Sequence, residues 1–294
     1  MRKAEPPAID TREDSALFQE AVRFTAAETG FAPRLIEKDY SCTLLLGYLD
    51  VTAGADLVFK GGTCLTKVHS ELYRLSEDLD YAIPVVPDTS RSERSKRVER
   101  VKTALSQLTK SVSVFRVIDR LRGANKSTQY MATIGYRSAF GQQEERIKIE
   151  VSLREPLLRP VFDGAARTML RSPLTSKSIV GPLPVRCIDK TEAIAEKFRA
   201  ALSRREPAIR DFFDIDYAVR NYKLRIDDEG LIAQVRQKLT IHGDQPVNVS
   251  DRRSADLRSQ VDSELKPVLR ERDFVEFDLD RAFEIVTEMA KAVA

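Results

Sequence analysis

The sequence predicts an α/β (α+β) protein with a mixed-sheet lobe at its N-terminal end and a helical lobe at its C-terminal end. Up to about residue 156, short apolar segments typical of strands alternate with segments of helical periodicity. A stretch interrupted by prolines follows, and helical periodicity dominates from residue 189 onward. We therefore expect an α/β lobe over residues 1–156, a connecting segment over 157–188 and a helical lobe over 189–294.

Two helices are expected before the first strand. Apolar residues recur at helical spacing over residues 11–28, and Gly30 ends this segment. A second helix is expected to begin at Pro33, because proline is favoured in the first helical turn, and to continue through the apolar run that ends near residue 49. The apolar end of this second helix predicts that it is buried under a sheet.

The rest of the α/β lobe alternates between strands and helices. In chain order the pattern predicts a strand over 56–60, a helix over 63–73, a strand over 79–86, a helix over 92–110, and a hairpin of two strands over 129–139 and 145–153. The pair Gly61-Gly62 separates the first strand from the helix that follows it.

The C-terminal part of the chain is predicted to be helical. Three prolines at 173, 182 and 184 indicate an irregular connection, part of which can form strands. The helices are then expected over about residues 189–204, 207–221, 227–240, 255–270 and 278–293. A ligand cleft is expected between the two lobes.

The composition is that of an ordinary globular protein, with 42% hydrophobic and 32% charged residues. No run approaches the roughly 20 apolar residues that a membrane span requires. The first ten residues lack the apolar stretch of a secretory signal. We therefore expect a cytoplasmic protein that does not act at a membrane.

Cysteine and histidine spacing indicates neither a disulfide framework nor a zinc site. The chain has three cysteines, Cys42, Cys64 and Cys187, with no Cys-x-x-Cys spacing. The two histidines, His69 and His242, have no partner at metal-ligand spacing. There is also no Gly-x-Ser-x-Gly and no Walker loop, so a serine hydrolase, a P-loop NTPase and a zinc enzyme are unsupported.

Basic residues are concentrated in one segment, although the net charge is only +3. Residues 90–126 contain eleven lysines or arginines and three acidic residues. A segment of this kind can attract the phosphates of a nucleic acid. A solvated helix face followed by a flexible loop would have the same composition, so both interpretations stay open.

The clearest chemical signal is a glycine pair followed by an Asp-x-Asp pair. Gly61 and Gly62 allow the close backbone approach that triphosphate oxygens require. Asp78 and Asp80 are two residues apart, so on a strand both point to one face and repel each other unless a cation lies between them. Either pair alone is usually a turn or a solvated surface. In the order strand, Gly-Gly, helix, Asp-x-Asp, strand, they predict phosphoryl or nucleotidyl transfer.

A further acidic residue lies in a predicted strand. Glu150 is flanked by apolar residues, so its charge has little structural reason unless something binds it. It is a candidate third metal ligand. Lys148 has the same parity on the strand, and a simple ion pair between the two is the alternative.

The order Gly-Gly-Thr, then Ser-x-Asp-x-Asp, resembles the signature of the polymerase-β-like nucleotidyltransferase fold. More narrowly, the chain resembles the AbiE-type (AbiEii) nucleotidyltransferase toxins of bacterial type IV toxin–antitoxin systems. Five stretches between residues 36 and 216 carry this resemblance: Ile36-Glu-Lys-Asp-Tyr40, Lys60-Gly-Gly-Thr63, Arg74-Leu-Ser76-Glu-Asp78-Leu-Asp80, Ala195-Glu-Lys197-Phe-Arg-Ala and Arg210-Asp211-Phe-Phe-Asp214-Ile. In the family, the interval between the Ser or Thr that follows the glycines and the Asp-x-Asp pair is usually shorter than the interval from Thr63 to Asp78 in this sequence.

The resemblance implies a role for each matching residue. It implies that Asp78 and Asp80 hold Mg²⁺, that Gly61, Gly62 and Thr63 cradle the triphosphate, that Lys60 supports this loop, and that Ser76 lies beside the site. It also implies that Lys197 neutralises triphosphate charge and that Asp211 is an essential acid, so that the helical lobe completes the active-site cleft. From the residues alone, Lys197 would be a surface lysine and Asp211 would cap its helix or pair with Arg210.

The function implied is that of a magnesium-dependent toxin that transfers a nucleotide from an NTP to RNA, with the 3′ end of tRNA as the leading acceptor. A toxin of this kind has a cognate antitoxin protein as its partner, and the basic segment would contact the RNA backbone. Two alternatives stay open. The same fold could modify a protein or a small molecule, or the chain could be a nucleotide- or RNA-binding protein without catalysis.

Overall fold

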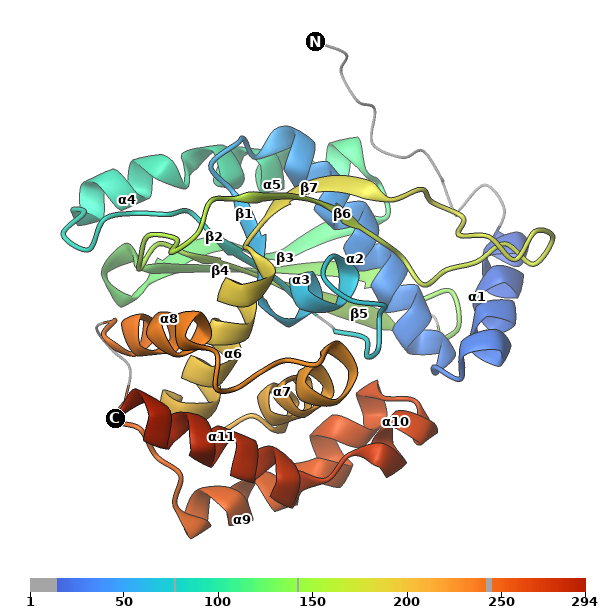
Figure 1. The fold of residues 1–294 in the computed structure, drawn as a ribbon. Helices are drawn as coiled ribbons and strands as arrows, with labels where there is room; N and C mark the ends of the chain where they lie inside the picture. Colours follow the sequence, from blue (N-terminus) through green and yellow to red (C-terminus); the bar gives the residue numbers. More distant parts are fainter. Residues whose placement is uncertain (1–14, 77, 142, 242–244) are drawn as a thin grey trace. The chain divides into compact units, whose positions relative to one another are not determined.

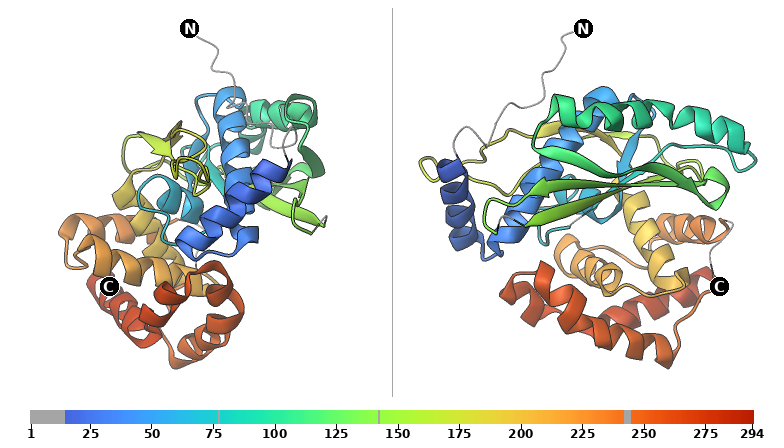
Figure 2. Two further views of the ribbon diagram at one scale, coloured as in Figure 1. Left: turned by 90° about the vertical axis from the view of Figure 1, so that its right-hand side faces the viewer. Right: turned by 180° about the vertical axis from the view of Figure 1, so that it is seen from behind.

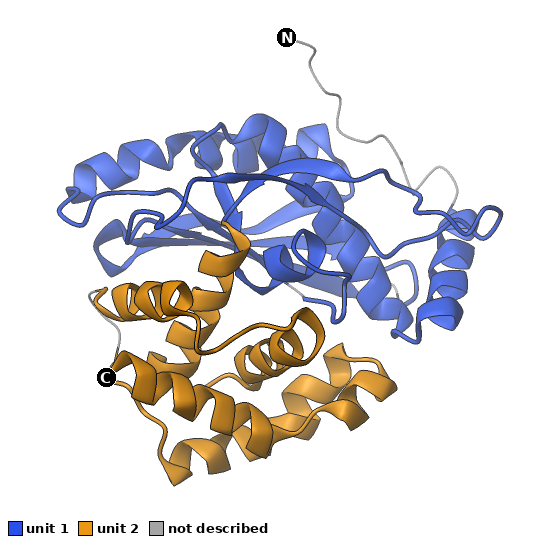
Figure 3. Ribbon diagram, in the orientation of Figure 1, with its two compact units in different colours: residues 1–188 blue, residues 189–294 orange. Residues whose placement is uncertain are grey.

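The computed structural model describes residues 15–76, 78–141, 143–241 and 245–294. The expected start of the first helix, Glu77 of the matched motif and His242 lie outside the described residues. The chain divides into two compact units, Met1–Ile188 and Asp189–Ala294 (Figure 3). The expected connecting segment, residues 157–188, therefore lies within the first unit.

The first unit is built on a seven-stranded mixed sheet (Figure 1). Its strands are β1 (Val58–Lys60), β2 (Leu79–Ala82), β3 (Phe115–Ala124), β4 (Gln129–Arg137), β5 (Glu144–Ser152), β6 (Phe162–Ala166) and β7 (Leu183–Cys187). Their spatial order is β3-β4-β5-β2-β1-β7-β6. The pairs β1/β7 and β2/β5 are parallel and the other pairs are antiparallel, which confirms the predicted α/β class.

Five α-helices of the first unit are described. They are α1 (Ser15–Thr29), α2 (Pro33–Thr52), α3 (Gly61–Lys67), α4 (Arg91–Arg97) and α5 (Glu99–Ser111). The apolar face of α5 packs against β3 and α2, and α3 packs against β1 and β2 (Figure 1). As expected, α2 is buried over most of its length. Among the described residues, no helix combines the length and the apolar character that crossing a membrane demands.

Three parts of the first unit differ from the predicted elements. The helix expected over 63–73 ends at Lys67, and Leu72 takes a positive φ of 53° that no helix permits. The helix expected over 92–110 is divided at Val98 into α4 and α5. The third difference is β3, an edge strand drawn in green in Figure 2, which was not predicted because charged residues and bulges obscure its alternation.

The second unit is helical, as predicted. Its α-helices are α6 (Lys190–Ser203), α7 (Ile209–Tyr222), α8 (Glu229–Leu239), α9 (Asp251–Gln260), α10 (Glu271–Glu276) and α11 (Leu279–Val293). The side chain of Asp189 caps α6 by accepting hydrogen bonds from the backbone N–H groups of Thr191 and Glu192. The helix expected over 255–270 instead ends at Gln260 and continues as short π and 3₁₀ turns, because Pro267 cannot extend a regular α-helix.

Candidate active site

Three adjacent strands bring Lys60, Asp80 and Glu150 to the same level of the sheet. Lys60 on β1 is the register partner of Asp80 on β2, and Asp80 is the partner of Glu150 on β5. Directly paired residues on neighbouring strands project from the same face. Asp80 therefore lies between a basic and an acidic side chain, and its neighbours Leu79 and Tyr81 are buried on the other face.

Asp78 is fixed by two contacts immediately before β2 begins. One of its carboxylate oxygens, Oδ1, accepts a hydrogen bond from the backbone N–H of Lys148 at 3.1 Å. The hydroxyl of the buried Thr63 donates to the backbone carbonyl oxygen of Asp78. Asp78 is thereby attached to β5 through its side chain and to the first turn of α3 through its backbone.

Gly61 can be replaced by no other residue without a shift in the structure. Its φ of +75° is rarely adopted by residues with a side chain. A Cβ atom at this position would lie 2.2 Å from Oδ2 of Asp80. The glycine therefore allows the backbone at the start of α3 to lie directly against the Asp80 carboxylate, as a loop that carries phosphates beside a metal ligand must.

Asp78, Asp80 and Glu150 line a single cavity of about 470 Å³. Three basic residues line the same cavity: Arg120 and Arg122 on β3 and Lys148 on β5. Among the described residues, these acids do not form a set of three whose ligand atoms all lie within 4.8 Å of one another. The cavity thus combines carboxylates that suit a divalent cation with positive charges that suit phosphate, while Glu150 as a metal ligand stays a prediction.

Gly62 and Ser76, which were also predicted to belong to the site, are not among the residues that line the cavity of Asp78 and Asp80. Gly62 is half-buried in the first turn of α3, and Ser76 is half-buried two residues before Asp78. Ser76 does not line the cavity that contains the two aspartates. Its placement beside the site therefore follows from its position in the chain.

The second unit brings Lys197 and Asp211 into direct contact. The ammonium Nζ of Lys197 on α6 lies 2.7 Å from Oδ1 of Asp211 and 2.8 Å from Oδ2 of Asp214, both on α7. Arg204 approaches the other oxygen of Asp211 at 3.1 Å. The side chain of Lys197 is only 12% exposed. The interpretation of Lys197 as an ordinary surface lysine is therefore wrong, and Asp211 pairs with Lys197 and Arg204.

The motif at residues 36–40 supports the fold and does not line the cavity. Asp39 is buried and holds the ammonium of Lys67, on α3, at 2.5 Å. The carboxylate of Glu37 accepts hydrogen bonds from the hydroxyl of Ser138 and the backbone N–H of Ala139, each at 2.7 Å. Burial is the main cause that raises the pKa of Glu37. These acids connect α2 to the elements that carry the site.

Sequence reasoning missed the contribution of β3. Asp119, Arg120 and Arg122 all line the cavity of the two aspartates, but they were assigned to a basic segment without a strand. A strand-like signal is present in Phe115, Val117 and Leu121, which are apolar and share one parity, although Ile118 and Asp119 interrupt the alternation. These three charged residues of β3 therefore belong to the candidate site.

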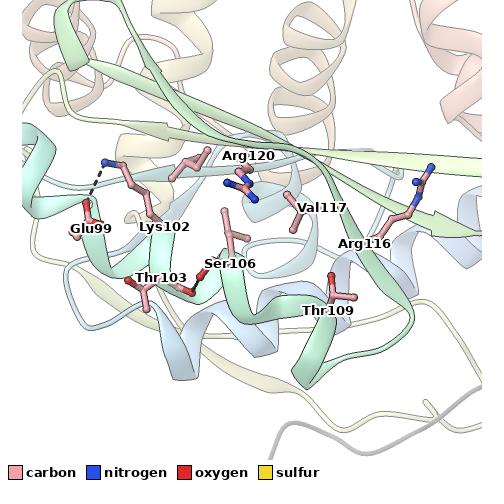
Figure 4. Close-up of a pocket in the computed structure, with 10 residues that line it drawn as sticks. Glu99, Lys102, Thr103, Ser106, Thr109, Arg116, Val117 and Arg120 are labelled. Atoms are coloured by element: carbon pink, nitrogen blue, oxygen red, sulfur yellow. Dashed lines mark hydrogen bonds and ion pairs between the residues drawn. The ribbon is translucent and has the colours of Figure 1, made fainter.

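A second pocket of about 620 Å³ lies between α5 and β3. Figure 4 shows Lys102 on α5 and Arg116 and Arg120 on β3 among its lining residues. Lys102 is paired with Glu99 at 3.1 Å. Arg120 lines both this pocket and the cavity of Asp78 and Asp80, so the two are neighbours along β3.

The order and geometry of these residues agree with one protein family. The family model described as "Nucleotidyl transferase AbiEii toxin, Type IV TA system" matches residues 43–286. The chain belongs to the AbiEii family. This AbiEii protein is therefore a nucleotidyltransferase and a toxin of a type IV toxin–antitoxin system, with an NTP as its substrate and an antitoxin as its partner.

Solved structures share the fold of this AbiEii protein at low sequence identity. JHP933 from Helicobacter pylori is 17% identical, with a TM-score of 0.52 over 90% of this chain and 93% of that chain. A second H. pylori chain, described as a nucleotidyltransferase, is 18% identical, with a TM-score of 0.50 over 90% and 96%. No curated protein matches the sequence. At these identities the likeness supports the fold.

Proposed function

We propose that this AbiEii toxin transfers a nucleoside monophosphate from an NTP to RNA in a magnesium-dependent reaction, with the 3′ end of tRNA as the leading acceptor. One observation carries the proposal. Asp78 and Asp80 line one cavity with three basic residues, Arg120, Arg122 and Lys148, and Gly61 allows the backbone at the start of α3 to lie against Asp80. Nucleotidyl transfer requires this combination of metal ligands, phosphate-binding backbone and positive charge.

The donor set fits a magnesium ion. Both candidate ligands are carboxylates, and Mg²⁺ is usually held by one or two protein carboxylates together with substrate phosphates and water. The bond from Lys148 N–H to Oδ1 of Asp78 fixes this carboxylate and still leaves its second oxygen for an ion. Asp78 and Asp80 would hold the ion, with Glu150 as the proposed third ligand, and the ion would neutralise charge on the triphosphate.

The reaction is a displacement at the α-phosphorus. A hydroxyl of the acceptor attacks this atom, the bond to the oxygen that bridges the α- and β-phosphorus atoms breaks, and pyrophosphate leaves. A cavity carboxylate accepts the proton of the attacking hydroxyl. Gly61, Gly62 and Thr63 would cradle the triphosphate, Lys60 would support their loop, and Ser76 would lie beside it.

Two residues of the second unit complete the proposal. On the family resemblance, Lys197 would neutralise negative charge on the triphosphate, and Asp211 would be the essential acid of the helical unit. The ion pairs of Lys197 with Asp211 and Asp214 fix the position of the ammonium, so the assignment of its role rests on the family resemblance. Asp211 also contacts Arg204, so its carboxylate would orient the side chains of both Lys197 and Arg204.

Basic side chains support RNA as the acceptor. The pocket between α5 and β3 carries Lys102, Arg116 and Arg120, and it adjoins the cavity of Asp78 and Asp80 at Arg120. An acceptor whose 3′ hydroxyl enters the cavity would place its phosphates along this pocket. A small-molecule acceptor has no need of a basic surface that extends beyond the reacting group.

The acceptor is tested by incubating the purified toxin with Mg²⁺, total RNA and each NTP labelled with ³²P at the α-phosphate. We expect label in bands of the size of tRNA, sensitive to RNase, and weaker labelling as salt concentration rises. Arg120→Ala should reduce labelling, whereas Arg225→Ala, an exposed arginine of the second unit, is the matched control. Label that survives RNase treatment would assign a protein or a small molecule as the acceptor.

A further inference from the structure

Two cysteines and a histidine that are far apart in the sequence meet in the first unit. The ligand atoms of Cys64, His69 and Cys187 all lie within 4.8 Å of one another. Cys64 belongs to α3, His69 follows this helix, and Cys187 is the last residue of β7. Among the described residues, this is the one group of three cysteine, histidine or acidic side chains that meets this distance.

The spacing is close to that of ligands around a tetrahedral zinc ion. With Zn–S of about 2.3 Å and Zn–N of about 2.0–2.1 Å, neighbouring ligand atoms are separated by about 3.5–3.8 Å. Sγ of Cys187 lies 4.0 Å from Nε2 of His69. Because all three distances are below 4.8 Å, inward movements of up to about half an ångström by each side chain would bring the atoms to bonding distance.

The two thiols lie in the interior of the first unit, beside the imidazole. Both cysteines are fully buried, while His69 is half-buried. A thiolate that is removed from water needs a cation beside it, and a zinc ion would supply this charge.

His69 has one competing contact. Its Nε2 lies 2.8 Å from the backbone carbonyl oxygen of Ile188, so without a metal this nitrogen carries the proton and donates it. Coordination through Nε2 would break this bond and move the proton to Nδ1. The ring is also held by Phe162, whose centroid lies 5.5 Å from that of the imidazole.

We propose that Cys64, His69 and Cys187 form a zinc site that is separate from the proposed magnesium site at Asp78 and Asp80. Two thiolates and an imidazole suit zinc, whereas magnesium prefers oxygen ligands. Three protein ligands leave one position of a tetrahedral zinc ion for a water molecule. Because Cys64 directly follows Thr63, zinc would fasten the nucleotide-binding turn at the start of α3 to β7.

The test uses cobalt as a probe and zinc as the competitor. The full-length protein, purified anaerobically and stripped with a chelator, is titrated with Co²⁺ while the thiolate-to-cobalt charge-transfer absorption is recorded. Zinc is then added, and the bound metal is counted by mass spectrometry. The variants are Cys64→Ser, Cys187→Ser and His69→Gln, with Cys42→Ser and the double variant Asp78→Asn/Asp80→Asn as controls.

We expect one equivalent of Co²⁺ with thiolate absorption in the wild-type protein and in both controls, and displacement of this ion by zinc. Each cysteine variant should lose the thiolate absorption, and His69→Gln should weaken binding at least tenfold. A wild-type protein without this absorption would overturn the proposal, as would absorption that both cysteine variants retain. A Cys64–Cys187 disulfide in the anaerobic protein would also overturn it. Zinc should raise the melting temperature of the wild-type protein, a readout that does not depend on how the variants fold.

Discussion

Removal of one partner from the buried ion pair between Asp39 and Lys67 is expected to destabilise the first unit strongly. Their side chains are 3% and 1% exposed, and Nζ of Lys67 lies 2.5 Å from Oδ1 of Asp39. Lys67 also donates to the hydroxyl of Thr43 at 2.7 Å, and the other oxygen of Asp39 accepts from the backbone N–H of Met169 at 2.8 Å. Asp39→Ala leaves a buried ammonium without its counter-charge and removes the partner of a buried N–H group.

Breaking a buried ion pair by removing one partner costs about 3–5 kcal/mol. For a unit of this size, each kcal/mol lowers the melting temperature by about 2–4 °C, so Asp39→Ala should lower it by about 6–20 °C. The double variant Asp39→Leu/Lys67→Met removes both charges and should be more stable than the single variant by about 2 kcal/mol or more.

Urea unfolding measures the change in the free energy of unfolding, and calorimetry measures the change in the melting temperature. The matched control is Asp227→Ala, which removes an exposed ion pair with Arg225 whose partners are 76% and 69% exposed. Exposed pairs contribute less than about 1 kcal/mol. If Asp39→Ala costs no more than this control, or if the double variant is less stable than Asp39→Ala, the argument for the buried pair is refuted.

Three further predictions concern the loop, the second unit and the metal. Gly61→Ala should lower the initial rate of nucleotide transfer at least tenfold, because the added Cβ would overlap the Asp80 carboxylate. Gly181→Ala is the control and should keep the wild-type rate, because a Cβ there would meet open space. Arg253→Met should lower the free energy of unfolding in urea by about 2–3 kcal/mol, because its guanidinium donates to the carbonyl oxygens of Ala201 in the last turn of α6 and of Arg204 at its C-cap. The exposed variant Arg252→Met should cost little. EDTA should abolish transfer and added Mg²⁺ should restore it; rates that EDTA leaves unchanged would contradict a metal-dependent reaction.

Local patterns were enough to predict the central strands of the sheet and the carboxylates that project from them. The alternation around Asp78, Asp80 and Glu150 fixes which face each side chain occupies, because strand geometry repeats every two residues. Gly61 lies at the strand-to-helix break that the sequence predicts, and it has a positive φ of 75°. These features depend on a few consecutive residues and on backbone geometry.

Features that depend on distant residues could not be read from local patterns. The group of Cys64, His69 and Cys187 combines residues up to 123 positions apart, and parallel pairing of β1 with β7 brings them together. Asp39 and Lys67 meet because α2 packs near α3, which no periodicity shows. β3 was missed because an edge strand carries charged residues, and its arginines were therefore counted in a basic segment to which no strand was assigned.

The most direct test of the central claim is a comparison of Asp80→Asn with Asp163→Asn in the transfer of ³²P from an α-labelled NTP. Asparagine keeps the size of the side chain and removes its charge. Asp163 is an exposed acid on β6, outside the cavity that contains Asp80. We expect transfer and pyrophosphate release to fall at least 100-fold in Asp80→Asn and to stay near the wild-type rate in Asp163→Asn. A folded Asp80→Asn protein with wild-type rates would contradict the assignment of the catalytic centre.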